Sequence, residues 1–180
     1  MNANWNNTMN PRNGAHHPAS ARRRLLLAVA TAPLLAACGF QLRQAPNFGF
    51  SRIAVVMPNN SALAAELRRQ LTDTGHIQIT DQAHAQVVFE SAGERRERVV
   101  VGLTATGEVR EFQLRINLKF RLHTAEGREL LPETEITRQI DQSYSETAAL
   151  SKEAEAAMLY RNLQNDIVQQ IVRRLATVKP

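Results

Sequence analysis

The 180-residue sequence predicts an α+β fold: a two-layer sandwich in which two helices pack on one face of a mixed, mainly antiparallel four-stranded sheet. Two observations carry this prediction. Residues 112–122 alternate strictly between apolar and polar side chains, which is typical of a long strand with one buried face. Segments near 61–75 and 151–177 repeat apolar residues at the helical period and therefore predict amphipathic helices. In chain order the elements read β-α-β-β-β-α, and two helices on one sheet face make two layers.

The domain begins with a predicted strand at 52–57, whose last five residues are apolar on both faces. This pattern is typical of a strand inside a sheet, and Pro58 ends it. A helix should follow, because Asn60 or Ser61 can cap its N-terminus and Gly75 suits the position just past its C-terminus. The apolar stripe of this helix consists of Leu63, Leu67 and Leu71.

The middle of the chain predicts strands joined by tight turns. Residues 77–79 fit a short strand, and 87–101 fit a longer extended segment. The turn sequence Ala-Thr-Gly at 105–107 leads into the alternating strand, and Ala-Glu-Gly at 125–127 leads out of it.

A last strand is predicted at 134–144, with Ile136 and Ile140 on one face. Pro132 argues against an earlier start, because proline cannot donate to a strand ladder. The chain then forms a helix that begins between residues 145 and 151 and ends near residue 177. Its apolar stripe consists of Tyr160, Leu163, Ile167, Ile171 and Leu175.

Residues 1–37 are predicted to be a secretory signal peptide. Three arginines at 22–24 precede an apolar run at 25–37, which is shorter than the roughly 18–20 residues that span a bilayer. The sequence Leu-Ala-Ala-Cys at 35–38 resembles the lipobox of bacterial lipoproteins, which predicts that the Cys38 thiol receives a diacylglycerol anchor and that the mature N-terminus becomes acylated. Gly39 is not aspartate, and by resemblance to lipoprotein sorting this favours the outer membrane. Residues 38–50 would then be a lipidated tether, and 51–178 the folded domain.

The charge distribution argues against nucleic-acid binding. The net charge is +5, but four of the 22 basic residues and none of the 17 acidic residues precede Cys38. The remainder therefore carries 18 basic against 17 acidic side chains. Its basic strand face also lacks the interleaved aromatic residues on which bases stack.

No catalytic or metal-binding constellation is recognisable in the sequence. Past the leader, His76, His84 and His123 are far apart and match no metal-ligand spacing, and a single Cys excludes a multi-cysteine site. The sequence therefore predicts no enzyme, no metal and no cofactor. A periplasmic cell-wall hydrolase is a weaker hypothesis, because it would need a catalytic constellation.

Basic side chains are the candidate binding residues. Arg95, Arg96 and Arg98 lie within one strand segment, and Lys152 lies near the start of the last helix. Arginine suits bidentate contact with phosphate, so such a group could hold a phosphorylated glycolipid. A solvated face neutralised by the neighbouring glutamates is the alternative explanation.

The segment Cys-Gly-Phe-Gln-Leu-Arg at 38–43 resembles the start of the LptE (RlpB) family of lipopolysaccharide-assembly lipoproteins. Residues 94–98, 111–114 and 166–175 are also similar to that family, so the resemblance covers essentially 38–178. It implies an outer-membrane lipoprotein that plugs the β-barrel LptD, helps to assemble it, and takes part in inserting lipopolysaccharide into the outer leaflet.

The resemblance also implies direct lipopolysaccharide binding through basic residues. Lys152 lies where such a residue is expected. The turn at 105–107 carries no basic residue, unlike that of some family members, which directs attention to Arg95, Arg96, Arg98 and Arg110. An auxiliary lipoprotein of an ABC-type lipid or solvent exporter is the alternative function, which would be distinguished by an inner-membrane transporter as its partner.

Overall fold

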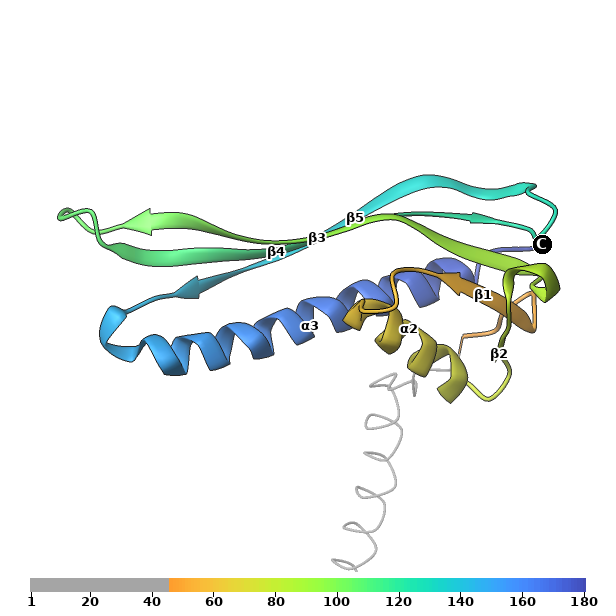
Figure 1. The fold of residues 1–180 in the computed structure, drawn as a ribbon, viewed down its shortest axis with the longest axis horizontal. Coiled ribbons are helices and arrows are strands. Elements are labelled where there is room, and N and C mark those ends of the chain that lie inside the picture. Colours follow the sequence, from red (N-terminus) through yellow and green to blue (C-terminus); the bar gives the residue numbers. More distant parts are fainter. Residues whose placement is uncertain (1–45) are drawn as a thin grey trace, which may run out of the picture. The chain divides into compact units, whose positions relative to one another are not determined.

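A computed structural model describes residues 46–180 (Figure 1). The predicted signal peptide, Cys38 and most of the predicted tether lie outside these residues. The helices and strands are β1 (Arg52–Val56), α2 (Ala62–Asp73), β2 (Gln78–Ile79), β3 (Val87–Leu103), β4 (Val109–His123), β5 (Glu129–Ser143) and α3 (Ala149–Leu175). Two short 3₁₀ helices, η1 (Gln82–His84) and η2 (Glu146–Ala148), precede β3 and α3.

The predicted fold class is confirmed. The strands form one mixed sheet in the order β2-β1-β3-β4-β5, and α2 and α3 lie on the same side of it (Figure 1). The sheet has five strands rather than the four predicted, because the two-residue β2 pairs in parallel with β1. β3, β4 and β5 are consecutive antiparallel strands.

Local sequence chemistry sets the element ends as expected. The Ser61 side chain accepts a hydrogen bond from the amide of Ala64 at 3.0 Å and caps α2. Gly107 and Gly127 have φ angles of +87° and +89° in the turns on either side of β4. A residue with a Cβ rarely adopts such angles, which explains why glycine occupies both turns.

The apolar core is concentrated at one end of the sheet. We call this the proximal end, where β1 and β2 pair beside β3, and the opposite end, with the β3–β4 turn, the distal end. Phe89 and Phe120 are fully buried and stack with ring centroids 5.0 Å apart. The helices complete the core mainly through the predicted leucine stripe of α2 and the C-terminal two-thirds of α3.

β5 begins five residues earlier than predicted, at Glu129, and includes Pro132. β5 is an edge strand, so a missing amide hydrogen need not cost a ladder bond. The register also shifts here, because Phe120 pairs with Thr134 while Leu122 pairs with Leu131. Pro132 therefore lies in a bulge on an edge, the place where sheets tolerate proline.

A second bulge reverses the side-chain alternation of β3. Ser91 pairs with Phe120 and Gly93 with Lys119, which leaves Ala92 as the extra residue. Directly paired residues share a sheet face, so odd-numbered residues of β3 face the helices before Ala92, and even-numbered residues face them from Glu94 to Val100, where the register shifts again. The distal half of β3 consequently turns arginine side chains toward α3.

Candidate functional site

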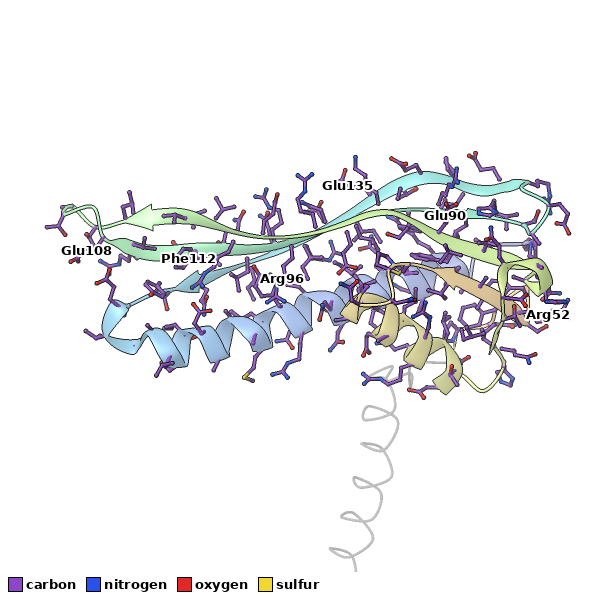
Figure 2. The ribbon with its side chains drawn as sticks, in the orientation of Figure 1. Arg52, Glu90, Arg96, Glu108, Phe112 and Glu135 are labelled. Carbon is purple, nitrogen blue, oxygen red and sulfur yellow. The ribbon has the colours of Figure 1, made fainter. Side chains whose placement is uncertain are left out.

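Strand alternation separates the three arginines that the sequence places together, and the bulge at Ala92 decides which of them face the helices. Arg96 and Arg98 pair with Ile116 and Leu114, whose side chains are buried under the helices, whereas Arg95 pairs with Asn117 on the helix-free face. Figure 2 shows Arg96 and Phe112 on the side of the sheet that faces α3. The predicted cluster is therefore two separate sites on opposite faces.

Arg98 lies among aromatic rings at the distal end. Its guanidinium carbon lies 3.9 Å from the ring centroid of Phe112 and 5.6 Å from that of Tyr144. Its Nη1 atom donates a hydrogen bond to Glu153 of α3 at 2.5 Å. The Nε and Nη2 atoms are buried and have no hydrogen-bond partner among the described residues, so Arg98 retains unused donor capacity.

Arg96 makes a cation–π contact about two turns further along α3 than the Arg98–Glu153 pair. Its guanidinium carbon lies 3.4 Å from the ring centroid of Tyr160, a cation–π geometry. The Tyr160 hydroxyl donates to the main-chain oxygen of Glu97 at 2.7 Å and so fixes the ring. We call Arg96, Arg98, Phe112, Tyr144 and Tyr160 the arginine–aromatic cluster. It joins α3 to the sheet where the apolar core ends.

Lys152 lies at the start of α3 and is held by polar partners. Its Nζ atom donates to Glu155 at 2.8 Å and to Ser143 at 3.1 Å, and its side chain is 21% exposed. The amide of Gln142, which is buried, donates to the main-chain oxygen of Lys152 at 2.7 Å. These contacts fix the first turn of α3 against the end of β5.

Arg95 and Arg110 are the exposed members of the predicted set. The Arg95 side chain is 74% exposed and lies 3.5 Å from a carboxylate oxygen of Glu97. It borders a hollow of ≈ 400 Å³ at the Ala92 bulge, together with Lys119. Arg110 borders a second hollow, of ≈ 460 Å³, at the distal end. Neither arginine belongs to the arginine–aromatic cluster.

The sequence did not identify Phe112, Tyr144 and Tyr160 as partners of the arginines, because Phe112 lies on β4, Tyr160 on α3 and Tyr144 in the connection between β5 and η2. Alternation placed Phe112 among core residues, and the helical stripe did the same for Tyr160. Which arginine contacts which ring depends on the side-chain phase of β3, which the bulge sets.

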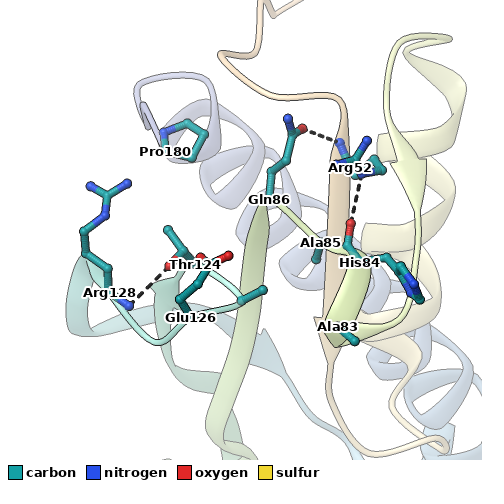
Figure 3. Close-up of a pocket in the computed structure, with 10 residues that line it drawn as sticks. Arg52, Ala83, His84, Ala85, Gln86, Thr124, Glu126, Arg128 and Pro180 are labelled. Atoms are coloured by element: carbon teal, nitrogen blue, oxygen red, sulfur yellow. Dashed lines mark hydrogen bonds between the residues drawn. The ribbon is translucent and has the colours of Figure 1, made fainter.

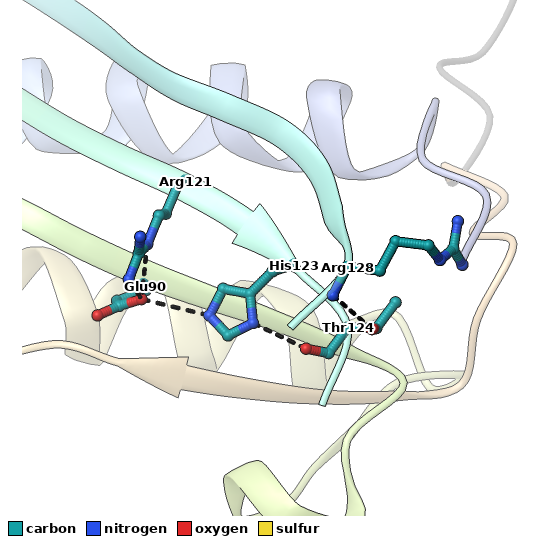
Figure 4. A network of polar contacts seen from close by, with 5 residues as sticks. All are labelled: Glu90, Arg121, His123, Thr124 and Arg128. Atoms are coloured by element: carbon teal, nitrogen blue, oxygen red, sulfur yellow. Dashed lines mark hydrogen bonds and ion pairs between the residues drawn. The ribbon is translucent and has the colours of Figure 1, made fainter. Parts of the chain in front are cut away.

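The proximal end carries a different polar network, on the helix-free face (Figure 4). Glu90 accepts a hydrogen bond from Nε of Arg121 at 2.8 Å, and Nε2 of His123 lies 3.2 Å from the same carboxylate oxygen. The other ring nitrogen of His123 lies 2.8 Å from the main-chain oxygen of Thr124. The hydrogen bond from Arg121, helped by His123, lowers the pKa of Glu90 below its ordinary value of 4.5.

This shift predicts an acid-dependent contribution to stability. A carboxyl group with a lowered pKa in the folded state stabilises the fold above its unfolded pKa, and the contribution disappears as the pH falls through the folded value. Glu90→Gln should therefore be less stable than the wild type at pH 7, by up to about 1 kcal/mol for such a partly exposed pair. In urea titrations the difference should begin to shrink as the pH falls to about 4.5 and should vanish once the pH lies below the lowered pKa of the folded state. Glu133→Gln, at an exposed position, serves as the control; a pH-independent difference for Glu90→Gln would contradict the explanation.

A hollow of ≈ 750 Å³ lies beside this network and is lined by Arg52, Gln86, Thr124, Arg128 and neighbouring residues (Figure 3). The Gln86 side-chain oxygen accepts hydrogen bonds from the amides of Ser51 and Arg52, at 2.8 and 3.1 Å. Nε of Arg52 donates to the main-chain oxygen of His84 at 2.9 Å. These bonds anchor the start of β1 to the start of β3.

Within residues 46–180, no group of three or more His, Cys, Asp or Glu side chains is arranged to hold a metal ion. In the same part of the chain, neither helix combines the length and apolarity needed to cross a membrane. His84 lies on the surface, with its Nδ1 atom 2.6 Å from Asp81.

Comparison with known proteins gives one family match and several similar structures. The model of the LptE family, described as lipopolysaccharide-assembly, matches residues 50–175. The solution structure of lipoprotein B from Nitrosomonas europaea is 29% identical, with a TM-score of 0.67 over 77% of this chain and 90% of that one. No match was found among curated proteins.

Two further crystal structures share the fold at lower identity. Rare lipoprotein B from Shewanella oneidensis is 19% identical, with a TM-score of 0.60, over 71% of this chain and 95% of that one. A minor lipoprotein from Acinetobacter baumannii is 16% identical, with a TM-score of 0.59, over 71% of this chain and 91% of that one.

Proposed function

The chain belongs to the LptE lipopolysaccharide-assembly family, and from that membership we propose that it is an outer-membrane lipoprotein that occupies the β-barrel LptD and helps to insert lipopolysaccharide into the outer leaflet. The family match over almost the whole described domain carries this proposal. It agrees with the resemblance seen in the sequence. LptE proteins act in lipopolysaccharide assembly and are not enzymes, so we assign no catalytic role to this chain.

The helix-free face of the sheet suits a polar environment. Asn117 accepts a hydrogen bond from Thr137 at 2.8 Å, and Gln113 donates to Asp141 at 3.0 Å. Figure 2 shows Glu90 and Glu135 on this same side. Side chains that bond to one another across strands present a polar surface, and the interior of a large membrane barrel is also polar.

The proposed partnership can be tested by purification. We expect the tagged, acylated protein extracted in mild detergent to bring with it a single large outer-membrane barrel in near-equal amount, identified by mass. Recovery of the lipoprotein alone would contradict the proposal. Recovery of an inner-membrane transporter would instead favour an auxiliary role in an exporter.

We propose the lipopolysaccharide contact at the distal end, where Lys152, Arg96 and Arg98 lie around the first turns of α3. The unused Nε and Nη2 donors of Arg98 support this proposal, because a phosphate oxygen is a suitable acceptor for a planar guanidinium. Arg110 and Arg95 are exposed and would reach lipid headgroups without breaking an internal contact other than the weak Arg95–Glu97 pair.

Charge reversal tests these residues. Lys152→Glu, and Arg95→Glu combined with Arg98→Glu, should each weaken lipopolysaccharide binding at least about tenfold, because losing one charge-assisted contact costs roughly 1.5–3 kcal/mol. The barrel complex should survive. Binding is measured with purified lipopolysaccharide, and Arg69→Glu on α2, 68% exposed, is the matched control.

Unchanged lipopolysaccharide binding in both variants would remove these residues from the site. Equal loss of lipopolysaccharide and of the barrel would indicate misfolding, which the circular dichroism spectrum of each variant would reveal.

A further inference from the structure

β3 has a long edge without a strand partner. β1 pairs with β3 only as far as Glu90, and within residues 46–180 no other strand lies on that side. Residues 91–103 of β3 therefore pair with β4 alone. At about 3.3 Å per residue this free edge is roughly 40 Å long, and it extends past β1 to the distal end (Figure 1).

The last part of this edge is apolar and exposed. Val99, Val100 and Val101 are 42%, 44% and 48% exposed, and Leu103 is 61% exposed. Val99 and Val100 lie on opposite faces of the strand, and Val101 is the extra residue where the register with β4 shifts between Val100 and Gly102. An exposed edge of β-branched residues without charge or proline readily accepts another strand.

The other edge of the sheet is protected. β5 carries Pro132 in its bulge, and its exposed positions include Glu133, Glu135 and Asp141. Proline and charges are the usual means by which edge strands avoid pairing with other chains. The sequence of β5 thus blocks pairing where the end of β3 permits it.

The first part of the free edge is charged and selects for a complementary strand. Residues 94–98 read Glu-Arg-Arg-Glu-Arg, and Arg95 is the most exposed of the residues in their ion pairs, at 74%. An added strand with an acidic residue beside Arg95 would be favoured over one with a basic residue there. Cross-strand charge pairs contribute roughly 0.2–1 kcal/mol each.

We propose that residues 91–103 of β3 form a docking edge to which an extended segment of the barrel partner adds as a further strand. The inference rests on the proposed function, which supplies the partner. The segment would place β-branched or aromatic residues beside Val99–Leu103 and an acidic residue near Arg95. An extended main chain can replace water on the row of edge amide and carbonyl groups, whereas acyl chains would cover the valines and leave those groups unpaired.

A second copy of the chain fits this edge less well. Antiparallel pairing of two apolar segments about Val101 would bring Arg95–Arg98 opposite residues 104–107 of the other copy. That turn reads Thr-Ala-Thr-Gly and has no acidic side chain. Self-pairing would therefore leave the charged part of the edge without complementary partners.

Hydrogen exchange of the complete acylated protein, alone and in the purified barrel complex, tests the docking edge. We expect amides within residues 91–103 to exchange at least about tenfold more slowly in the complex. A strand-blocking variant, Val99→Lys with Val101→Lys, should reduce barrel recovery at least tenfold. Leu150→Lys with Met158→Lys is the matched control, because these α3 residues are 90% and 59% exposed, and it should retain recovery within twofold.

Each outcome separates the hypotheses. Unchanged exchange at 91–103 in an intact complex overturns the docking edge and leaves the proposed function standing. Slow exchange that depends on the concentration of the lipoprotein alone identifies a second copy as the occupant and also overturns the inference. Failure of the wild type to recover any barrel overturns the proposed function itself, before either variant is compared.

Discussion

Cys38→Ala is expected to abolish acylation and to remove the protein from the outer-membrane fraction. Each buried methylene of an acyl chain contributes about 0.8 kcal/mol to membrane binding, and stable attachment needs more than one chain. Without the thiol there is no site for the diacylglycerol, so the amount in the outer-membrane fraction should fall at least tenfold. Density-gradient fractionation measures the location, and the mass of the N-terminal peptide measures acylation.

Gly39→Asp is the informative companion variant, because it leaves the thiol in place. By resemblance to lipoprotein sorting, it should remain acylated but accumulate in the inner membrane. If Cys38→Ala were still recovered at the wild-type level in the outer membrane, the lipid would not be the anchor.

Phe120→Ala should produce the largest loss of stability among single substitutions in the core. Phe120 is fully buried and stacks on Phe89, which is also fully buried. Replacing a buried phenylalanine by alanine typically costs about 3–5 kcal/mol, because contacts are lost and a cavity remains. That is a large part of the 5–15 kcal/mol by which domains are usually stable.

Urea unfolding followed by circular dichroism measures this change. Leu150→Ala removes an equally apolar side chain that is 90% exposed, so its free energy of unfolding should stay within about 0.5 kcal/mol of the wild type. A loss below 1 kcal/mol for Phe120→Ala would mean that the two rings do not form the centre of the core.

Features that depend on local chemistry were predictable from the sequence. Ser61 and Gly75 bound the first helix as expected, since a side-chain cap and a positive φ angle involve only neighbouring residues. The strict alternation of β4 also located the buried sheet face correctly, because six apolar residues in one register leave a single consistent orientation.

The facing of side chains beyond a β-bulge was not predictable, because one extra residue in a strand reverses the face of every residue that follows it. Ala92 shifts the phase of β3, and the only sequence cue is Gly93 within a strand. Without the bulge, Arg95 would face the helices and Arg96 would not. The sequence grouping of Arg95 with Arg96 and Arg98 overlooked strand alternation, and the bulge determines that Arg96 and Arg98 are the ones that face α3. Pro132 misled in a similar way, because its compatibility with β5 depends on the edge position of that strand.

The uneven distribution of the core has a consequence for motion. None of the α3 residues from Ala149 to Glu155 is buried. Polar contacts attach this stretch to the sheet: those of Lys152 with Ser143 and Gln142, and the ion pair of Glu153 with Arg98. Segments with few buried apolar contacts open at low free-energy cost. The first turns of α3 can therefore separate from the distal end of the sheet while the core at the proximal end stays folded.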